Sequence, residues 1–509
     1  MLSTTLETEA GNAHPTKDRA RPAVWQKGAP ALVWPAVCAA AWLIRYCSLY
    51  GLPWRSPPFW AGWYDQSHYL VSTLALAHGD LSASAHWYPL GYSLLATPFA
   101  WFVPSDPFFL PDLFLFVATG IAFQRVVHGF GIGAATAMLI FLAACLIQAP
   151  IAKAWLQPWN TNVSAALLWW LSALTIALFA PPRRSRPAAT TTELVLIGVL
   201  AGALPLVRPI DISLSLICLG FALYAVRRRQ PLVRASGLML TGALIPIVPY
   251  VLLHLAIYGP HATQYMADAA RNGFVPGDIG WKSYVLLVTP RPWFPGTRSI
   301  LETMPWLLFG AAGAVALLAT AFRERRVAAI LLTILIFASA LPFIAYVDLQ
   351  PPGLWKFKNF HYFKWFVPYW GAGLFLWLRL LGRSGHPLAA IFSLLAVSLP
   401  LCIRITPVPV ADTVPARMLL FRGDTSRDWA QAYFAPAVVT DSLGAQHNVH
   451  DFHLMPDAAG VRAIAVKRFF GAHPLLDDPG DPVVRAQRGV PYARFGEHIS
   501  FGRPLIYAR

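Results

Sequence analysis

The stretch A-S-G-L-M-L-T-G-A-L-I-P-I-V-P-Y-V-L-L-H-L-A-I occupies residues 235–257 and contains no Asp, Glu, Lys or Arg. Because a helix rises about 1.5 Å per residue, roughly 20 apolar residues cross the hydrocarbon core of a bilayer. Residues 235–257 therefore have the length and composition of a membrane-spanning helix. Similar runs recur from residue 30 to residue 405. The chain is predicted to be an α-helical polytopic membrane protein.

The composition of the whole chain supports this class. Of its 509 residues, 56% are hydrophobic and only 13% are charged, which argues against disorder and against a mainly soluble protein. All five cysteines lie in apolar segments, so neither a disulfide framework nor a Cys-x-x-Cys metal site is predicted. The formal net charge is +16, yet the residues from 406 onward hold 11 basic and 10 acidic residues. The excess positive charge therefore belongs to the membrane part, and no nucleic-acid partner is predicted.

The apolar runs predict eleven membrane-spanning helices. They lie near 30–50, 107–124, 131–150, 161–180, 192–210, 212–226, 235–257, 303–321, 327–346, 366–381 and 387–405. Arginine-rich connections alternate with arginine-poor ones, and the positive-inside rule makes the arginine-rich set cytoplasmic. That set carries Arg125, Arg183, Arg184, Arg186, Arg227, Arg228, Arg229, Arg234, Arg323, Arg325, Arg326, Arg379 and Arg383. The N-terminus is then inside, and the odd number of spans places the C-terminus outside.

This topology divides the chain into three regions. Residues 1–29 form a cytoplasmic tail, residues 30–405 a transmembrane domain, and residues 406–509 an extracytoplasmic domain. The last region gains Asp, His and Gly and ends in two strand-like segments, 492–501 and 504–507, so a small α/β domain is predicted there.

The first outer loop is predicted to contain interfacial helices. Residues 64–77 have the pattern of an amphipathic helix that stops at Gly79. Residues 87–102 are interrupted by prolines and are too broken for an ordinary span. Both segments are expected to lie in, or dip into, the outer interface of the membrane.

Among the acidic residues predicted to lie outside, Asp65 has the most unusual surroundings. It stands in W-Y-D-Q-S-H-Y-L at 63–70, where the spacing places Asp65, His68 and Tyr69 on one helical face. A carboxylate partly removed from water has a raised pKa, which suits a general base at a membrane surface. Asp is also a favoured N-cap, so a structural role at the start of the helix is the alternative.

Several short stretches follow the order of motifs in a known family. They are L-I-R-Y at 43–46, W-Y-D-Q-S-H-Y-L at 63–70, W-Y-P-L-G-Y-S-L-L at 87–95, G-V-L-A-G-A-L-P-L-V-R-P at 198–209 and N-F-H-Y-F-K-W-F-V-P at 359–368. In this order the chain resembles the GT-C glycosyltransferases, which include protein mannosyltransferases and lipid A aminoarabinose transferases. Members of that class take a sugar from a polyprenyl-phosphate carrier. The resemblance covers residues 40–400, and each motif in it is short.

The resemblance implies roles for individual residues. Asp65 matches the catalytic aspartate of the family, which acts on the acceptor hydroxyl, and Tyr69 matches its tyrosine. The sequence departs from the family at other positions. Gln66 replaces a second acidic residue, His68 and His361 replace arginines, and Tyr88 replaces a lysine of the aminoarabinose transferases. His68, Tyr69 and Tyr88 are therefore candidate donor-binding residues, but the family's phosphate contacts must come partly from elsewhere.

A cluster of cations is the candidate replacement. Lys356, Lys358, His361 and Lys364 lie within nine residues near the predicted outer end of 366–381. A phosphodiester donor needs cations that hold it and neutralise the departing phosphate. The alternative is that these lysines only extend to lipid headgroups, as lysines at helix ends do in any membrane protein.

Three further residues are candidates for lining a cavity near the same end. Arg208 and Asp211 are predicted to pair with each other, because isolated charges near a membrane are costly. Lys153 lies in the short second outer loop. Asp65 has no carboxylate nearby in the sequence, so no metal site and no cofactor are predicted.

These observations predict an inverting glycosyltransferase with Asp65 as the general base. The partners expected are a polyprenyl-phosphate-sugar donor, membrane lipids, and an acceptor that is a glycan, a lipid or a protein. Arginine-rich composition suggests a bacterial source and hence the plasma (inner) membrane as the location. A lipid-linked-sugar flippase or a secondary transporter is the competing class, since it would also have many spans and intramembrane charges. A third hypothesis makes the C-terminal region a binding module on a membrane anchor.

Overall fold

The computed structural model describes residues 32–51, 64–179, 191–319 and 323–383, with short gaps at 105, 273, 275, 277–278, 291–297, 347–348, 350–352 and 357, and five strands between 418 and 467. The chain is mostly helical, as predicted. Its longer helices are α1 (Val33–Tyr50), α2 (Tyr64–Ala77), α4 (Phe109–His128), α5 (Ala134–Leu142), α6 (Ala149–Leu156), α7 (Asn160–Ala177), α8 (Thr191–Val207), α9 (Ile212–Val226), α10 (Leu232–Tyr258), α11 (Gln264–Asn272), α12 (Ile279–Leu287), α14 (Leu307–Leu318), α15 (Arg323–Ala345) and α17 (Val367–Arg383).

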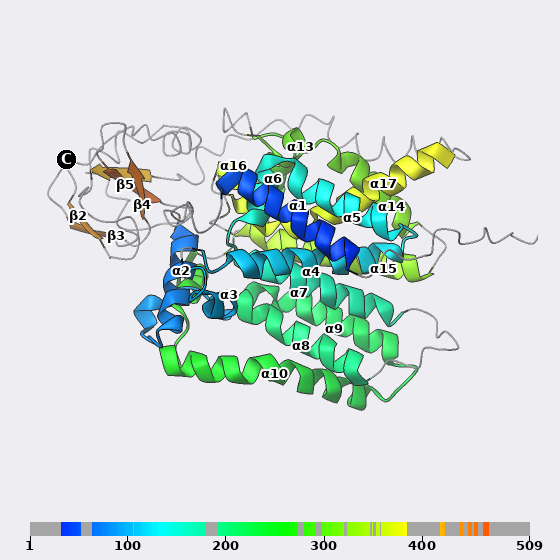
Figure 1. Cartoon of the computed structure of the whole chain (residues 1–509), viewed down its shortest axis with the longest axis horizontal. Helices are drawn as coiled ribbons and strands as arrows, with labels where there is room; N and C mark the ends of the chain where they lie inside the picture. Colours follow the sequence, from blue (N-terminus) through cyan, green and yellow to red (C-terminus); the bar gives the residue numbers. More distant parts are fainter. Residues whose placement is uncertain are drawn as a thin grey trace, which may run out of the picture.

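Short helical turns connect them. They are η1 (Ala83–Ala85), α3 (Gly91–Ala96), η2 (Thr97–Phe99), η3 (Ala143–Ile147), η4 (Pro209–Asp211), α13 (Ile300–Thr303), α16 (Gly353–Lys356), η6 (Asn359–Tyr362) and η7 (Lys364–Phe366). In Figure 1 most of the long helices run side by side along the long axis of the molecule.

Four of the described helical segments are long and apolar enough to cross a membrane: Phe109–His128, Pro209–Val226, Leu232–Tyr258 and Arg325–Ala345. A fifth results if α5 to η3 and α6 are counted as one broken span. The prediction of eleven spans is therefore not reproduced. The other predicted runs within the described residues also form helices, but α8, α14 and α17 have only 17, 12 and 17 residues. The last predicted run, 387–405, lies outside the described residues.

The run predicted at 131–150 is broken. The helix that begins at Ala134 ends at Ile147, and α6 continues at an angle of 97° to it. Pro150 explains the break, because proline lacks an N–H and its ring clashes with the carbonyl group four residues earlier. Gln148, at the bend, has an extended backbone with ψ 122°. The bend turns α6, which carries Lys153, away from the direction of α5.

Small residues allow two pairs of helices to pack closely. A side chain at Gly198 of α8 would collide with the backbone of Met239 in α10, and one at Gly313 of α14 would collide with the backbone of Gly373 in α17. Such glycines are typical of helix interfaces inside membranes, where close backbone approach provides the van der Waals contact.

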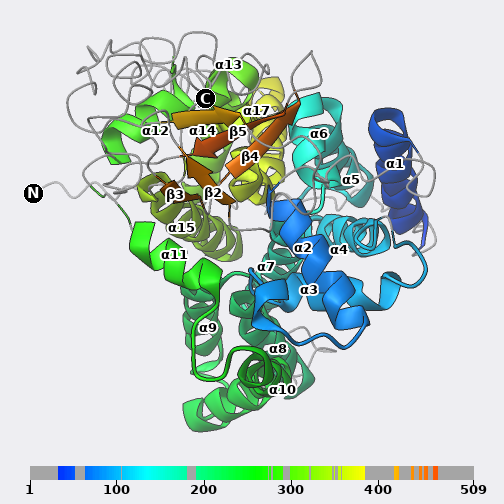
Figure 2. The same cartoon turned by 90° about the vertical axis from the view of Figure 1, so that its left-hand side faces the viewer.

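The two ends of the helical bundle differ in composition. At one end, Arg379 Nη1 donates to Gly131 O at 3.1 Å and Arg229 Nη1 donates to Leu178 O at 2.9 Å. The described residues at this end also include Arg227 and Arg228, at the end of α9, and the end lies on the right in Figure 1. The opposite end carries α2, α3 and α11, which Figure 2 shows together from that side. The ends of α9 and α17 with their arginines therefore lie opposite the described part of the first loop.

The helices predicted in the first loop are confirmed. Residues Tyr64–Ala77 form α2, and Gly79 follows it with a φ of 73°, a conformation that favours glycine. Residues 87–102 contain only the short α3 and η2, with Pro98 within η2. Asp65 lies in the first turn of α2.

Five short strands are described in the C-terminal region: β1 (Met418–Arg422), β2 (Ala437–Thr440), β3 (Gln446–Val449), β4 (Phe452–Pro456) and β5 (Arg462–Lys467). They form an antiparallel sheet in the order β1-β5-β4 and a separate antiparallel pair, β2 and β3. The described residues of this region contain strands and no helix, so the mixed α/β domain is not reproduced. The strand pair predicted at 492–507 lies outside the described residues.

Candidate functional site

Asp65 is held by a tyrosine from the same loop. The hydroxyl of Tyr88 donates to Asp65 Oδ1 at 2.5 Å. The Asp65 side chain is half-buried, whereas Tyr88 is buried. A hydrogen bond from a buried phenol fixes the direction of the carboxylate and stabilises its ionised form. Asp65, the candidate base, and Tyr88, a candidate donor-binding residue, are therefore in direct contact.

Aromatic rings surround this pair. Tyr69 packs on Tyr88 with ring centroids 4.8 Å apart, and Tyr265 of α11 packs on Tyr88 at the same separation. Burial and the nearby charge of Asp65 raise the pKa of Tyr69 well above its usual range, so its hydroxyl stays protonated. Tyr69 is thus a rigid neutral neighbour of the carboxylate.

His68 does not have the environment of a phosphate-binding cation. It is buried, its ring stacks on Trp87 at 5.0 Å, and burial lowers its pKa to about 3. A neutral imidazole cannot neutralise a phosphate as the family's arginine would. The structure therefore gives His68 the surroundings of a packing residue beneath Trp87.

Gln66 joins α2 to the start of α7. It is buried, and its Nε2 atom donates to Pro158 O at 3.0 Å. The backbone of Asn160 also hydrogen-bonds to Tyr69. Residues 157–162, which we call the bridging segment, therefore lie against the helix that carries Asp65. The amide of Gln66 therefore anchors the helix that carries Asp65.

The bridging segment also contacts the predicted cation cluster. His361 stacks on Trp159, with ring centroids 3.7 Å apart and an interplanar angle of 11°, and its Nδ1 atom lies 3.2 Å from Thr161 Oγ1. Lys364 donates to Asn162 Oδ1 and, at 2.7 Å, to Ala154 O. One short segment thus connects the helix of Asp65 to η6 and η7.

Lys364 and His361 are buried, which contradicts the alternative that these side chains only extend to lipid headgroups. Lys364 is fully buried, and its Nζ atom lies 4.9 Å from the centroid of the Trp155 ring. Burial lowers the pKa of Lys364 well below its usual range, although nearby Asp112 acts in the opposite direction. Burial, with the charges of Lys364 and Arg208, likewise lowers the pKa of His361. Both side chains therefore contact protein groups in the interior, and neither presents a positive charge to a ligand at the surface of the site.

Lys358 and Lys153 form the accessible part of the cation cluster. Lys153 is exposed and Lys358 is half-buried. Burial and, second, the positive charge of Lys153 lower the pKa of Lys358 to about 8. Lys358 also has a φ of 59°, a left-handed conformation that costs energy for a residue with a side chain. The side chain of Lys356, the fourth predicted cation, lies outside the described residues.

The predicted Arg208–Asp211 pair is confirmed. Arg208 Nη1 and Asp211 Oδ2 are 3.5 Å apart, and both side chains are buried. The guanidinium lies 4.6 Å from the ring centroid of Phe343 and 5.4 Å from that of Tyr362. Its charge acts on both Tyr69 and His361. Arg208 therefore lies between the aspartate side and the histidine side of the site.

Sequence reasoning missed Asp112, Asn162 and Tyr92 as site residues. Tyr92 OH donates to both oxygens of Asp112, at 3.1 and 3.0 Å, and Asn162 also hydrogen-bonds to Asp112. Asp112 in turn is a neighbour of Lys364. A charged residue inside a predicted span was the available signal for Asp112, but no local pattern marks Asn162 or Tyr92.

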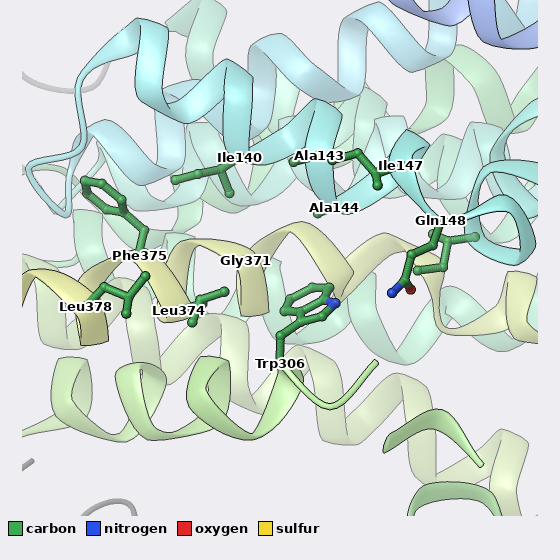
Figure 3. Close-up of a pocket in the computed structure, with 11 residues that line it drawn as sticks. Ile140, Ala143, Ala144, Ile147, Gln148, Trp306, Gly371, Leu374, Phe375 and Leu378 are labelled. Atoms are coloured by element: carbon green, nitrogen blue, oxygen red, sulfur yellow. The ribbon is translucent and has the colours of Figure 1, made fainter. Parts of the chain in front are cut away.

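An apolar groove of about 450 Å³ opens beside the bent helix. Ile140 and Ala144 form one wall, Gly371 and Phe375 of α17 the other, and Trp306 lies across it (Figure 3). Gln148 is a polar residue at one end. Ile151 of α6, two residues before Lys153, also lines the groove. The groove therefore extends from the helix that carries Lys153 along α5 and α17.

Within the described part of the chain, no group of three or more His, Cys, Asp or Glu side chains is placed to hold a metal ion. Comparison of the chain with protein families, with curated proteins and with solved structures gives no match.

Proposed function

We propose that this protein is a GT-C-like glycosyltransferase, which transfers a sugar from a polyprenyl-phosphate carrier to an acceptor hydroxyl. The observation that supports this proposal is the bridging segment. It contacts the helix of Asp65 through Gln66 and contacts η6 through Thr161. The candidate base therefore lies on one side of the segment, and η6, which directly follows the candidate phosphate-binding residue Lys358, lies on the other.

Asp65 acts as the general base in this mechanism. Its carboxylate takes the proton of the acceptor hydroxyl, and the acceptor oxygen forms a bond to the anomeric carbon of the sugar. The bond from that carbon to the phosphate oxygen breaks, and its electron pair leaves with the lipid phosphate. Attack and departure occur on opposite faces, so the configuration inverts. Tyr88 holds the carboxylate in position through its 2.5 Å hydrogen bond.

Lys358 and Lys153 receive the leaving phosphate. Two neighbouring ammonium groups repel each other, which is the second cause of the lowered pKa of Lys358. A bound phosphate removes that repulsion and gains charge-assisted hydrogen bonds. The lipid tail of the donor then lies in the apolar groove, to which α6 contributes Ile151. A tail in this position keeps the phosphate at the end of α6.

The arginine-bearing end of the bundle is assigned to the cytoplasm. Loops with many arginines face the cytoplasm in bacterial inner-membrane proteins. Asp65, α3 and α11 at the opposite end are then extracytoplasmic, as is the C-terminal region. The reaction would accordingly take place at the outer face of the plasma membrane.

A transporter or flippase is the second candidate, supported by the bend at Gln148 and by the buried Arg208–Asp211 pair. Transporters place such features near the middle of the membrane. Here Arg208 follows the last residue of α8, and Asp211 precedes the first residue of α9. The pair therefore lies at helix ends beside the aspartate site, which favours the transferase.

The decisive experiment replaces Asp65 by Asn and measures transfer of radiolabelled sugar from the lipid fraction to the acceptor fraction of membranes. The amide keeps the shape of the carboxylate but cannot accept the proton, so we expect a loss of about 100-fold or more. Asp80→Asn is the matched control, because Asp80 is an exposed acid of the same loop. If Asp65→Asn keeps more than about a tenth of the activity, the proposed base is wrong.

A further inference from the structure

An aromatic wall stands beside Asp65. It consists of Trp87, Tyr88 and Tyr265. The backbone N–H of Tyr265 donates to Trp87 O at 3.3 Å, and the Tyr265 ring packs on Tyr88 at 4.8 Å. Trp87 and Tyr265 are half-buried, whereas Tyr88 is buried and donates its hydroxyl to Asp65. Aromatic residues that are only half-buried therefore adjoin the proposed base.

Neighbouring side chains hold the aromatic wall in place. The ring of His68 stacks on Trp87, and Tyr69 packs on Tyr88. Thr263 fixes the start of α11, because its Oγ1 atom accepts from Met266 N at 3.2 Å. The positions of the two half-buried rings are thus set by packing before any ligand binds, which lowers the entropy cost of binding.

A sugar ring matches this surface. Its C–H faces are apolar and flat enough to stack on an aromatic ring, while its hydroxyl groups donate to a carboxylate at the edge. Resting on the proposed function, we propose that the acceptor is a saccharide, which stacks on Trp87 and Tyr265 and places one hydroxyl at Asp65.

Another class of acceptor fits less well. A lipid alcohol needs an apolar channel that ends at the base. The apolar groove is instead built mainly from η3 and α17, with single residues from α5 and α6, and none of these carries Asp65, Trp87 or Tyr265. A protein acceptor is an outcome that the experiment distinguishes.

The test uses the full chain in lipid nanodiscs and saturation-transfer NMR. The probes are cellobiose, maltose and chitobiose, with acetyl-Ala-Thr-Ala-amide as the peptide probe. We expect at least one disaccharide to receive saturation at its ring C–H protons and the peptide to receive none. Trp87→Ala and Tyr265→Ala should each weaken disaccharide binding by roughly 3- to 10-fold, the scale of one lost aromatic contact. Trp87→Phe and Tyr265→Phe should retain most of it.

Trp101→Ala is the matched control, because Trp101 is 69% exposed and belongs to the same loop region. It should leave disaccharide binding unchanged. The saccharide proposal is overturned if no disaccharide binds, if binding is the same in both alanine variants, or if the peptide binds in a way that depends on Trp87.

These outcomes are separate from failure of the proposed function. Saccharide binding that depends on the aromatic wall, together with an active Asp65→Asn variant, would remove the general base but keep the saccharide site. Loss of transfer in Asp65→Asn, together with a parent protein that binds no saccharide, would keep the general base but remove the saccharide site.

Discussion

Lys358 and Lys364 lie six residues apart in one cationic stretch, yet the fold gives them opposite environments. Lys364 is fully buried and donates to Ala154 and Asn162, whereas Lys358 is half-buried beside the exposed Lys153. His361 also lies in the interior, where its ring stacks on Trp159. A cluster that the sequence presents as one anion site is therefore divided into an internal cross-link and an accessible pair of lysines.

The division shows that burial, more than residue type, assigns a role to a cation. A buried ammonium must be satisfied by protein groups, and the packing that buries it keeps a ligand at the surface from reaching it. An ammonium near another one at the surface gains most when an anion arrives. The comparison can be tested at each of the three residues.

The largest expected effect is on stability at the buried lysine. Lys364→Met keeps the length of the side chain but leaves Ala154 O and Asn162 Oδ1 without their donor. At about 1 to 3 kcal/mol for each of the two buried groups left unpaired, the variant should lose roughly 2 to 6 kcal/mol of folding free energy. Thermal unfolding of the purified protein in nanodiscs measures the loss.

Lys358→Met is the matched control for this prediction, because Lys358 is only half-buried. Its unfolding temperature should stay close to that of the parent protein. Equal stability losses in the two variants would contradict the division between an internal and an accessible lysine.

A smaller effect is expected on the pH dependence of donor binding. The pKa of Lys358 is lowered to about 8, so the residue is mostly charged at pH 7 and mostly neutral at pH 9. Binding of a polyprenyl methyl phosphodiester, whose charge is constant in this range, should therefore weaken about tenfold as the pH rises from 7 to 9. Fluorescence titration in nanodiscs measures it.

Two variants check the assignment to Lys358. Lys358→Arg keeps its charge across the range, so its binding profile should be flat. Lys358→Gln should bind more weakly than the parent at pH 7 and should also be flat. A profile that still falls with pH in both variants would place the titrating group elsewhere.

The smallest expected effect is at His361. Burial and the charges of Lys364 and Arg208 keep its pKa well below the usual histidine value, so the imidazole stays neutral near pH 6. Binding of the same phosphodiester should therefore show no transition with a midpoint near 6.5, the pKa of an ordinary histidine, between about pH 5.5 and 7.5. A fall with a midpoint near 6.5 that disappears in His361→Gln would show that His361 binds the phosphate as a cation.

The sequence by itself determined that the chain is mostly helical and that several helices are apolar and long enough to cross a membrane, because the length and apolarity of a run are local properties. It also determined α2 with its stop at Gly79 and the Arg208–Asp211 pair, since both depend on residues close together in the chain. It did not determine the number of spans. Breaks such as the one at Gln148, and helices shortened to 12 residues as in α14, arise where proline and packing interrupt an apolar run.

Only the tertiary structure decided how the candidate site is assembled. Asn162 stands in an unremarkable position at the start of α7, and its contact with Lys364 bridges 202 residues of sequence. Gln66 meets Pro158 across 92 residues. No local pattern encodes such contacts, because they depend on where several helices end relative to one another. The same packing decides which cations are buried, and so which of them are left to meet a ligand.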